Sequence, residues 1–246
     1  MPKNEIIITF SVVSHGQMNM IKGLINDLIS IKNINFELII TLNISEDFSD
    51  LPNTDFSIKI IKNLYQKGFG SNHNYAFQFS SGYYFLIINP DIRFNYLCLE
   101  ELIYAFDDDS VGAVAPLVLT PTGSIDDSAR RFPSIFSLFL RSFFGKRSID
   151  YPTDSGPVVI DWAGGMFLLF RKDIYSLLNG FDEKKFYMYF EDVDICRRLK
   201  IAGYKLMLIP HVNVIHYAQR DSTKKIKFLF WHIKSALRYF ITSTFD

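Results

Sequence analysis

Short apolar runs alternate with amphipathic stretches along the first half of the chain. The runs predict β-strands over residues 6–13, 36–42, 58–62, 83–88 and 111–119. The stretches between them predict helices over residues 18–31, 71–79 and 95–106, with Ser71 capping the second. Alternating strands and helices are typical of a single α/β domain in which helices flank a mainly parallel sheet. Because such sheets bind ligands beyond the carboxyl ends of their strands, we expect His15, Asn43 and Asp91 to share one edge.

The pattern changes after residue 119. Residues 120–161 are rich in turn-forming and aromatic residues, which predicts an inserted flap or acceptor-binding region and not another strand and helix. The regular pattern then returns. It predicts a strand over residues 166–170, a helix that opens at Glu191 and stops at Gly203, and closing strands over 204–209 and 212–216.

Composition excludes several classes of function. A chain of 246 residues with 48% hydrophobic residues can bury the core of one large domain. The formal net charge is zero, which argues against a nucleic-acid partner. Cys98 and Cys196 are too few for a disulfide framework or a zinc site and suit a reducing, cytoplasmic location. Neither a signal-peptide pattern nor a run of ~18 uncharged apolar residues is present, so we expect no export and no membrane span.

Residues 220–246 predict a separate basic, amphipathic helix. Its apolar positions follow a spacing of four and three and therefore share one face: Ile226, Phe230, Ile233, Leu237 and Phe240. Residues 220–238 carry a formal charge of +5. The apolar face can lie on an anionic membrane surface. It can equally pack on the rest of the protein while the lysines remain in water.

Two acidic signals mark the candidate chemistry. Glu191-Asp192-Val193-Asp194 stands between the aromatic run 186–190 and an amphipathic helix. Carboxylates at a helix start often only cap free N–H groups and complement the helix dipole. The aromatic run, however, predicts that one side of a cleft is partly shielded from water. A second acidic signal, Asn89-Pro90-Asp91, ends the most apolar strand of the first half. Two such ends usually converge on one crevice in an α/β domain.

The motifs, taken in order, resemble those of the family two inverting glycosyltransferases over nearly the whole chain. They lie at residues 6–16, 68–74, 86–91, 162–165, 180–183, 190–199 and 210–216. Within that family the chain is most similar to bacterial rhamnosyltransferases of O-antigen and related surface polysaccharide assembly. The residues that carry this similarity are 13–16, 128–133, 161–165 and 231–235. The resemblance implies a GT-A type fold with a nucleotide-binding half at 1–119 and an acceptor-binding half at 120–219.

The resemblance also implies the reaction, an inverting transfer of L-rhamnose from dTDP-L-rhamnose to a polyprenyl-diphosphate-linked saccharide. A first alternative is the same fold acting on a UDP-sugar of galactose, N-acetylglucosamine or galactofuranose. A second is a catalytically weak nucleotide-sugar-binding subunit of a polysaccharide assembly complex. Asn89 and Leu42 favour this second alternative, because each occupies a position where the family commonly has an aspartate.

Roles follow from the family motifs. Asp192 matches the catalytic base, which Glu191 would orient, while Asp91 and His216 match the ligands of Mg²⁺ or Mn²⁺. His216 could instead be a buried, hydrogen-bonded histidine, and Asn89-Pro90-Asp91 a simple turn. The donor-binding candidates are Ser14, His15, Asn43, Gly70, Asn74, Asn89 and Asp91. The acceptor-binding candidates are Arg130, Arg131, Trp162, Gly164, Gly165 and Asp194.

Three of these assignments rest on residues that allow more than one role. The pair Arg130-Arg131 can bind an acceptor diphosphate through charge-assisted bonds or form a solvated basic turn. Because Leu42 replaces the aspartate that contacts the pyrimidine in the family, recognition of the base would pass to Asn43, Glu46 or main-chain groups. Gly70 would let the backbone approach the nucleotide, although residues 68–74 lack the third glycine of a dinucleotide fingerprint.

Overall fold

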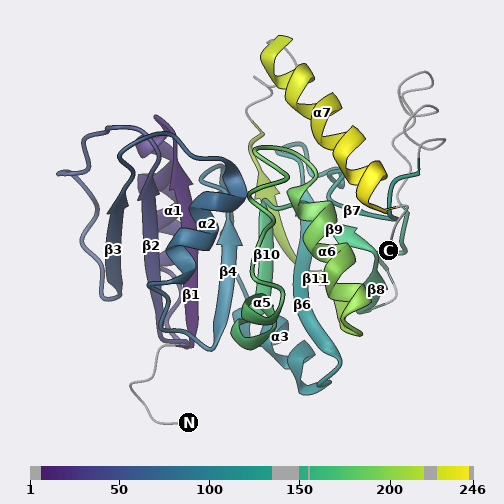
Figure 1. Cartoon of the computed structure of the whole chain (residues 1–246). Helices are drawn as coiled ribbons and strands as arrows, with labels where there is room; N and C mark the ends of the chain where they lie inside the picture. Colours follow the sequence, from purple (N-terminus) through teal and green to yellow (C-terminus); the bar gives the residue numbers. More distant parts are fainter. Residues whose placement is uncertain (1–6, 135–149, 155, 219–225, 244–246) are drawn as a thin grey trace.

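A computed structural model describes residues 7–134, 150–154, 156–218 and 226–243. One nine-stranded mixed sheet runs through the molecule in the order β3-β2-β1-β4-β10-β6-β11-β5, with β8 beside β11 (Figure 1). The strands are β1 (Ile8–Ser14), β2 (Phe36–Leu42), β3 (Ser57–Lys62), β4 (Tyr84–Ile88), β5 (Ile92–Arg93), β6 (Val111–Leu119), β8 (Val158–Ile160), β10 (Phe167–Arg171) and β11 (Lys205–His216). A separate two-stranded ribbon pairs β7 (Ala129–Arg130) with β9 (Trp162–Ala163).

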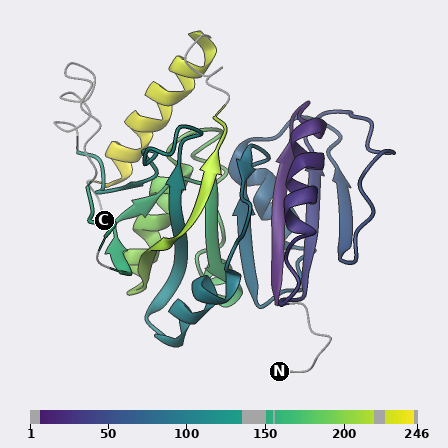
Figure 2. The same ribbon diagram turned by 180° about the vertical axis from the view of Figure 1, so that it is seen from behind.

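Helices cover both faces of the sheet. They are α1 (Met18–Leu28), α2 (Phe69–Phe77), α3 (Leu99–Tyr104) with a 3-10 turn at Ala105–Asp107, α5 (Lys172–Leu177), α6 (Glu191–Ile201) and α7 (Ile226–Ser243). The apolar residues of α1 and α3 join one core cluster, and those of α5 and α6 join another on the opposite face. Figure 2 shows α1 in front of the sheet when the molecule is seen from behind. The expected α/β architecture with helices on both faces is therefore confirmed.

The strands of the first half follow directly from their sequence. Strand β2 is buried along its whole length, which is why its residues are apolar apart from Glu37 and Thr41. Strands β3, β2, β1 and β4 pair in parallel, so their carboxyl ends meet at one edge. Strand β10 then runs antiparallel to both β4 and β6. The edge that holds the ends of β1 and β4 therefore also holds the start of β10.

Two local predictions were wrong. The helix expected over residues 71–79 begins at Phe69, and Gly68 stands at its cap position without a side-chain bond, so Ser71 does not cap it. The closing strands expected over 204–209 and 212–216 form the single strand β11. Its pairing with β6 shifts register between Ile209 and Asn213, around Pro210, which lacks the N–H that a regular ladder needs. Residues 210–211 interrupt the apolar run, so the sequence pattern predicted two strands where the structure has one.

Candidate functional site

The donor-side candidates lie where the parallel strands end. The backbone N–H of Asn43, which follows β2, donates to the carbonyl of Ser14 at the end of β1, at 2.9 Å. The side chain of Asn43 is buried and fully engaged, because its Oδ1 accepts from Lys67 N–H at 2.8 Å and from Asn63 Nδ2 at 2.9 Å. Its Nδ2 donates to the carbonyl of Lys67 at 2.9 Å and lies 3.2 Å from Nδ1 of His15. Asn43 thus fixes the strand ends, and the exposed His15 presents a ring to solvent.

Glu46, one of the residues considered for base recognition, holds the end of β1. Its carboxylate accepts hydrogen bonds from Ser14 Oγ at 2.9 Å and from the N–H of Gly16 at 2.8 Å. Gly16 has a φ of 82°, a conformation that glycine adopts without strain. Ser14 and Glu46 therefore shape the loop that carries His15.

Gly70 and Asn74 join α2 to the loop before the acidic helix. A side chain at Gly70 would place its Cβ 2.6 Å from Cβ of Phe181, so the position admits only glycine without a shift of that residue. Asn74 Oδ1 accepts from the N–H of Phe181 at 2.9 Å and from Tyr175 Oη at 2.8 Å. Its Nδ2 donates to the carbonyl of Phe181 at 2.8 Å. These contacts favour a structural role for both candidates.

The metal-ligand candidates lie side by side. Strand β5, which directly follows Asp91, pairs with the end of β11, and this ladder sets His216 beside Ile92. The Nε2 atom of His216 lies 3.5 Å from Oδ1 of Asp91, and its Nδ1 lies 2.9 Å from Oδ2 of Asp126. Oδ1 of Asp91 is buried and accepts no hydrogen bond within the described part of the chain. Asp126 was missed by the sequence analysis, because it stands in a turn-rich segment without any distinctive motif.

The electrostatics of this cluster favour a cation. Burial opposes the charged imidazole, but the hydrogen bond to Asp126 and the negative charges of Asp126 and Asp91 outweigh it and raise the pKa of His216 to about 9. An unbonded carboxylate oxygen facing a histidine whose other nitrogen is held by a second carboxylate is a fitting pair of ligands for a divalent ion. Among the described residues no cluster of three or more His, Cys, Asp or Glu side chains is placed to bind a metal. Two protein ligands suit Mg²⁺ or Mn²⁺ held chiefly by substrate phosphates and water.

The acidic helix lies next to the same edge. The N–H of Gly165, just before β10, donates to Oδ2 of Asp192 at 3.2 Å. The next residue, Met166, accepts from the N–H of Asn89 at 2.9 Å, which extends the pairing of β4 with β10 toward Asp91. Asp192 is therefore one strand away from the Asn89-Pro90-Asp91 turn. The two acidic signals share one edge of the sheet.

Glu191 and Asp192 have different surroundings. Glu191 is 7% exposed, and its Oε2 meets no hydrogen-bond partner in the described residues. Burial, and secondarily the charge of Asp192, raises the pKa of Glu191. Asp192 is half-buried and accepts bonds from the backbone N–H groups of Gly165 and Val193, while burial raises its pKa too. Burial therefore disfavours a negative charge on both neighbouring carboxyl groups, and most strongly on the enclosed Glu191.

The turn before α6 has a strained backbone. Tyr189 and Phe190 have φ values of 70° and 67°, a left-handed conformation that bulky residues rarely adopt. Such a conformation costs of order 1–3 kcal/mol for each residue and persists only where the surroundings impose it. No pattern in the sequence signals it. The turn fixes where Glu191 and Asp192 begin their helix.

Asp194 has a structural environment. Its Oδ2 lies 2.8 Å from Nε of Arg198, one helical turn later. The same guanidinium donates to the carbonyls of Leu178 and Gly180 at 2.7 and 2.9 Å. Asp194 therefore orients an arginine that ties α6 to the segment after α5, an arrangement that does not favour contact with an acceptor.

The acceptor-side candidates gather on the β7–β9 ribbon. Arg130 is 5% exposed and its guanidinium pairs with Asp127 and Asp150, a buried arrangement that favours a structural role. Arg131 is exposed, and its carbonyl accepts from Nε1 of Trp162 at 2.9 Å. Gly164 donates to the carbonyl of Ser128 at 2.8 Å. The ribbon thus leads from the 120–161 segment back to Gly165 and Asp192.

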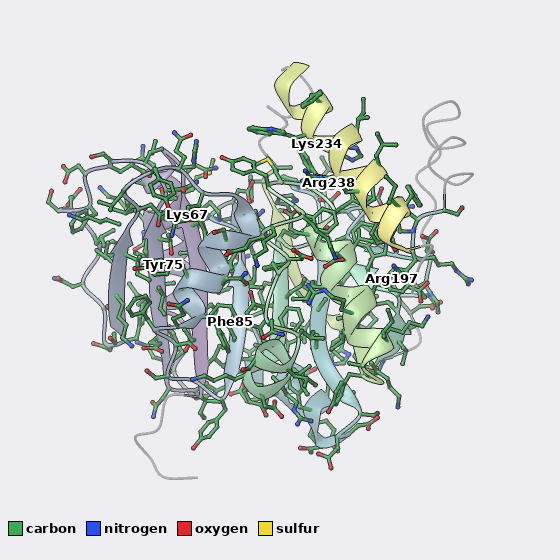
Figure 3. All side chains as sticks on the ribbon, viewed as in Figure 1. Lys67, Tyr75, Phe85, Arg197, Lys234 and Arg238 are labelled. Carbon is green, nitrogen blue, oxygen red and sulfur yellow. The ribbon has the colours of Figure 1, made fainter. Side chains whose placement is uncertain are left out.

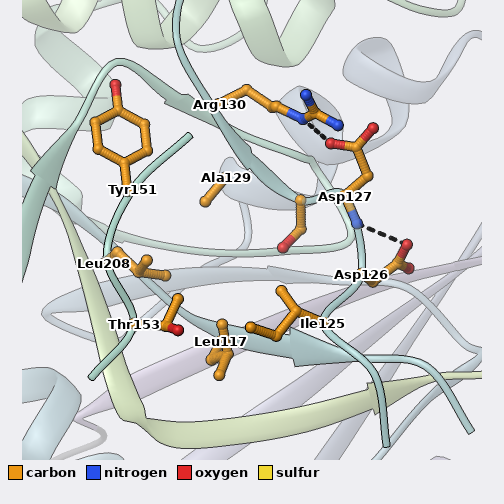
Figure 4. Close-up of a pocket in the computed structure, with 10 residues that line it drawn as sticks. Leu117, Ile125, Asp126, Asp127, Ala129, Arg130, Tyr151, Thr153 and Leu208 are labelled. Carbon is orange, nitrogen blue, oxygen red and sulfur yellow. Dashed lines mark hydrogen bonds and ion pairs between the residues drawn. The ribbon is translucent and has the colours of Figure 1, made fainter. Parts of the chain in front are cut away.

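A small cavity lies behind this ribbon (Figure 4). Its volume is about 50 Å³, and Asp126, Arg130 and Tyr151 contribute to its wall. This space admits a water molecule or two but no sugar. By its volume, this cavity is too small to hold an acceptor sugar.

Comparison with known proteins identifies the family of this chain. Residues 7–175 match a protein family described as Glycosyl transferase family 2. The chain belongs to this family. It is 30% identical to Rhamnosyltransferase WbbL of Escherichia coli K12 over 93% of this chain and 90% of that protein. It is also 30% identical to the N-acetylglucosaminyl-diphospho-decaprenol L-rhamnosyltransferase of Mycobacterium tuberculosis H37Rv, over 54% of this chain and 46% of that protein. The protein is thus a glycosyltransferase whose similar relatives are rhamnosyltransferases, as its motifs predicted.

Solved structures show the same fold at low identity. The mannosyltransferase PcManGT of Pyrobaculum calidifontis, in complex with GDP-Man and Mn²⁺, matches with a TM-score of 0.63 at 16% identity, over 96% of this chain and 66% of that one. TarS of S. aureus in complex with UDP matches with a TM-score of 0.60 at 11% identity, over 87% of this chain and 61% of that one. The GT-A fold is therefore confirmed. None of the helices in the described ranges is both long and apolar enough to cross a membrane.

Proposed function

We propose that this glycosyltransferase moves L-rhamnose from dTDP-L-rhamnose, with inversion, onto a polyprenyl-diphosphate-linked saccharide. The observation that carries the proposal is the bond from Gly165 to Asp192, which sets a carboxylate one strand away from the Asn89-Pro90-Asp91 turn. The two rhamnosyltransferase relatives support the sugar, and the name of the mycobacterial one supports the acceptor class. We further propose that the protein acts at the cytoplasmic face of a bacterial membrane, where such an acceptor would be reached.

Each demand of the reaction has a candidate group. Asp91 and His216 would hold Mg²⁺ or Mn²⁺, which supplies positive charge to the departing diphosphate. The acceptor hydroxyl would attack the anomeric carbon from the face opposite the nucleotide, and Asp192 would remove the proton from that hydroxyl. Glu191, held neutral by burial, leaves that task to its neighbour. Arg131 and Trp162, on the ribbon beside Asp192, are the remaining candidates for acceptor contact.

Nucleotide release in a donor and acceptor panel tests this function. With Mn²⁺ and a polyprenyl-diphosphate-linked N-acetylglucosamine acceptor, we expect acceptor-dependent release of dTDP from dTDP-L-rhamnose and its loss in EDTA. We expect Asp91→Asn to reduce this release strongly, because one of the two ligand candidates loses its charge. Faster transfer from UDP-galactose or UDP-N-acetylglucosamine would replace the donor assignment. Acceptor-independent binding without any turnover would favour the catalytically weak subunit.

A further inference from the structure

Helix α7 packs on the rest of the protein with the face that carries Ser235 and Tyr239. Among the residues of α7 whose exposure is described, these two are buried, at 5% and 3% exposure. Ser235 Oγ donates to the carbonyl of Met188 at 2.9 Å, and the ring of Tyr239 packs on Phe190 with centroids 5.5 Å apart. This face therefore seats α7 on the segment that leads into the acidic helix.

The opposite face of α7 carries an exposed apolar row. The row consists of Phe230, Ile233, Leu237 and Ile241, with exposures of 62, 51, 59 and 62%. Residues spaced by three and four share one helix face. Leu237 lies two positions from both Ser235 and Tyr239, which puts it about 160° around the helix from each at 3.6 residues per turn. Three residues of the apolar stripe expected from the sequence, Phe230, Ile233 and Leu237, are therefore exposed. Phe240 packs on the protein, and the side chain of Ile226 lies outside the described residues.

The charge of α7 identifies what covers this row. Residues 226–243 contain no Asp or Glu. Lys234 and Arg238, labelled on the helix in Figure 3, are exposed and follow the row along one side, and Nη1 of Arg238 also donates to the carbonyl of Lys185. A row of large apolar side chains flanked by basic residues on an exposed helix suits an interface between anionic headgroups and acyl chains. Nothing in this face offers the acidic groups that a basic surface of a second copy would need.

We propose that α7 binds the surface of an anionic phospholipid bilayer through the row Phe230, Ile233, Leu237 and Ile241, with Lys234 beside it. The row enters the boundary of the acyl chains and the basic side chains meet lipid phosphates. Because the other face of the same helix holds Met188 and Phe190, lipid binding sets the acidic helix at a fixed height above the membrane. The position of the acidic helix above the membrane rests on the proposed function, since it matters only for a lipid-linked acceptor. The binding of α7 to the bilayer does not depend on that function.

Vesicle flotation of the full chain tests the proposal without any sugar chemistry. We expect binding to phosphatidylcholine vesicles that contain phosphatidylglycerol, weak binding to phosphatidylcholine alone, and weaker binding at high salt. Phe230→Ser with Leu237→Ser should reduce the partition coefficient at least tenfold, because two large apolar side chains leave the lipid. Lys234→Ser should reduce it about fivefold, the loss of one basic contact.

A matched double variant provides the control. Leu177 on α5 and Ile201 on α6 are 58 and 61% exposed, nearly the same as the two row residues. Leu177→Ser with Ile201→Ser removes as much exposed apolar surface and should leave vesicle binding unchanged. Equal loss in both double variants, or unaltered binding in the row variant, would overturn the proposal. So would a dimer in lipid-free sedimentation that the row variant abolishes, because the row would then be an interface between copies.

Discussion

The replacement Asp192→Asn tests the catalytic assignment most directly. The side chain keeps its size, and the half-buried position stays filled. If Asp192 is the base, its loss should slow transfer by about 10²–10⁴-fold, the usual worth of a general base. That corresponds to about 3–5 kcal/mol of transition-state free energy. Donor binding should survive, because the donor candidates lie at the ends of the parallel strands and on α2, and none lies on α6.

The structure also predicts what the variant does to stability. Both carboxylate oxygens of Asp192 accept a backbone N–H, one from Gly165 at 3.2 Å and one from Val193 at 2.9 Å. An asparagine has only one acceptor oxygen, so one N–H faces the amide NH₂ and costs about 1–3 kcal/mol. Removing a buried negative charge beside Glu191 offsets part of this cost. We therefore expect a small net change in the free energy of unfolding.

A destabilised neighbour provides the comparison for both measurements. Val193 is 4% exposed in the same turn and carries no proton-accepting group. Val193→Ala should cost roughly 1–3 kcal/mol of stability through the cavity it leaves while transfer falls only a few-fold. The rate would be followed by dTDP release and donor affinity by calorimetry. Near-normal turnover of Asp192→Asn, or an equal loss in Val193→Ala, would refute the reasoning.

Three further predictions follow from other groups. The pKa of Glu191 is raised in the folded state, so above pH 4.5 the folded protein binds more protons than the unfolded chain. The free energy of unfolding should therefore fall as the pH rises through the raised pKa. In denaturant titrations, Glu191→Gln should remove this fall and raise the free energy of unfolding near pH 8 by about 1 kcal/mol or more. If the variant kept the same dependence of stability on pH, the carboxyl of Glu191 would not be buried in its neutral form. With a pKa of about 9, His216 must lose a proton to bind a metal, so Mn²⁺ affinity measured by calorimetry should rise up to tenfold per pH unit between pH 6 and 8, a slope absent in His216→Asn. The row variant of α7 should transfer rhamnose slowly to a vesicle-embedded acceptor yet bind dTDP-rhamnose normally, and equal transfer rates would separate lipid binding from catalysis.

The sequence predicted the parallel half of the sheet because local signals determine it. Each of its strands is an apolar run that ends at a turn, and parallel pairing places those ends together. The position of β10 could not be predicted in this way. Its antiparallel neighbours, residues 84–88 and 113–114, lie far from it in the chain, so no local pattern reports them. Yet β10 is the strand that brings Gly165 to Asp192.

Within the site, the motifs located Asp91, Asp192 and His216, but not their partners. Asp126 bonds His216 from a turn-rich segment, and its role depends on a contact between residues ninety positions apart. The apolar period of residues 226–240 correctly predicted a helix face. It could not say which way that face points, because the polar Ser235 and the half-polar Tyr239 supply the buried side. The spacing of apolar residues shows how apolar and polar side chains divide around a helix, but which face is buried depends on the surface against which the helix packs.

The strained turn at Tyr189 and Phe190 links α2, the acidic helix α6 and α7. Just before it, the carbonyl of Tyr187 accepts from the N–H of Phe69 at 3.1 Å, the first residue of α2. A side chain at Gly68 would clash with that same carbonyl, at 2.2 Å. On its other side the turn is held by Ser235 and Tyr239 of α7. A left-handed pair that costs a few kcal/mol needs such support from two directions, and removing either support would let the turn relax. The position of Asp192 therefore depends on contacts with both α2 and the helix α7 that we assign to the membrane.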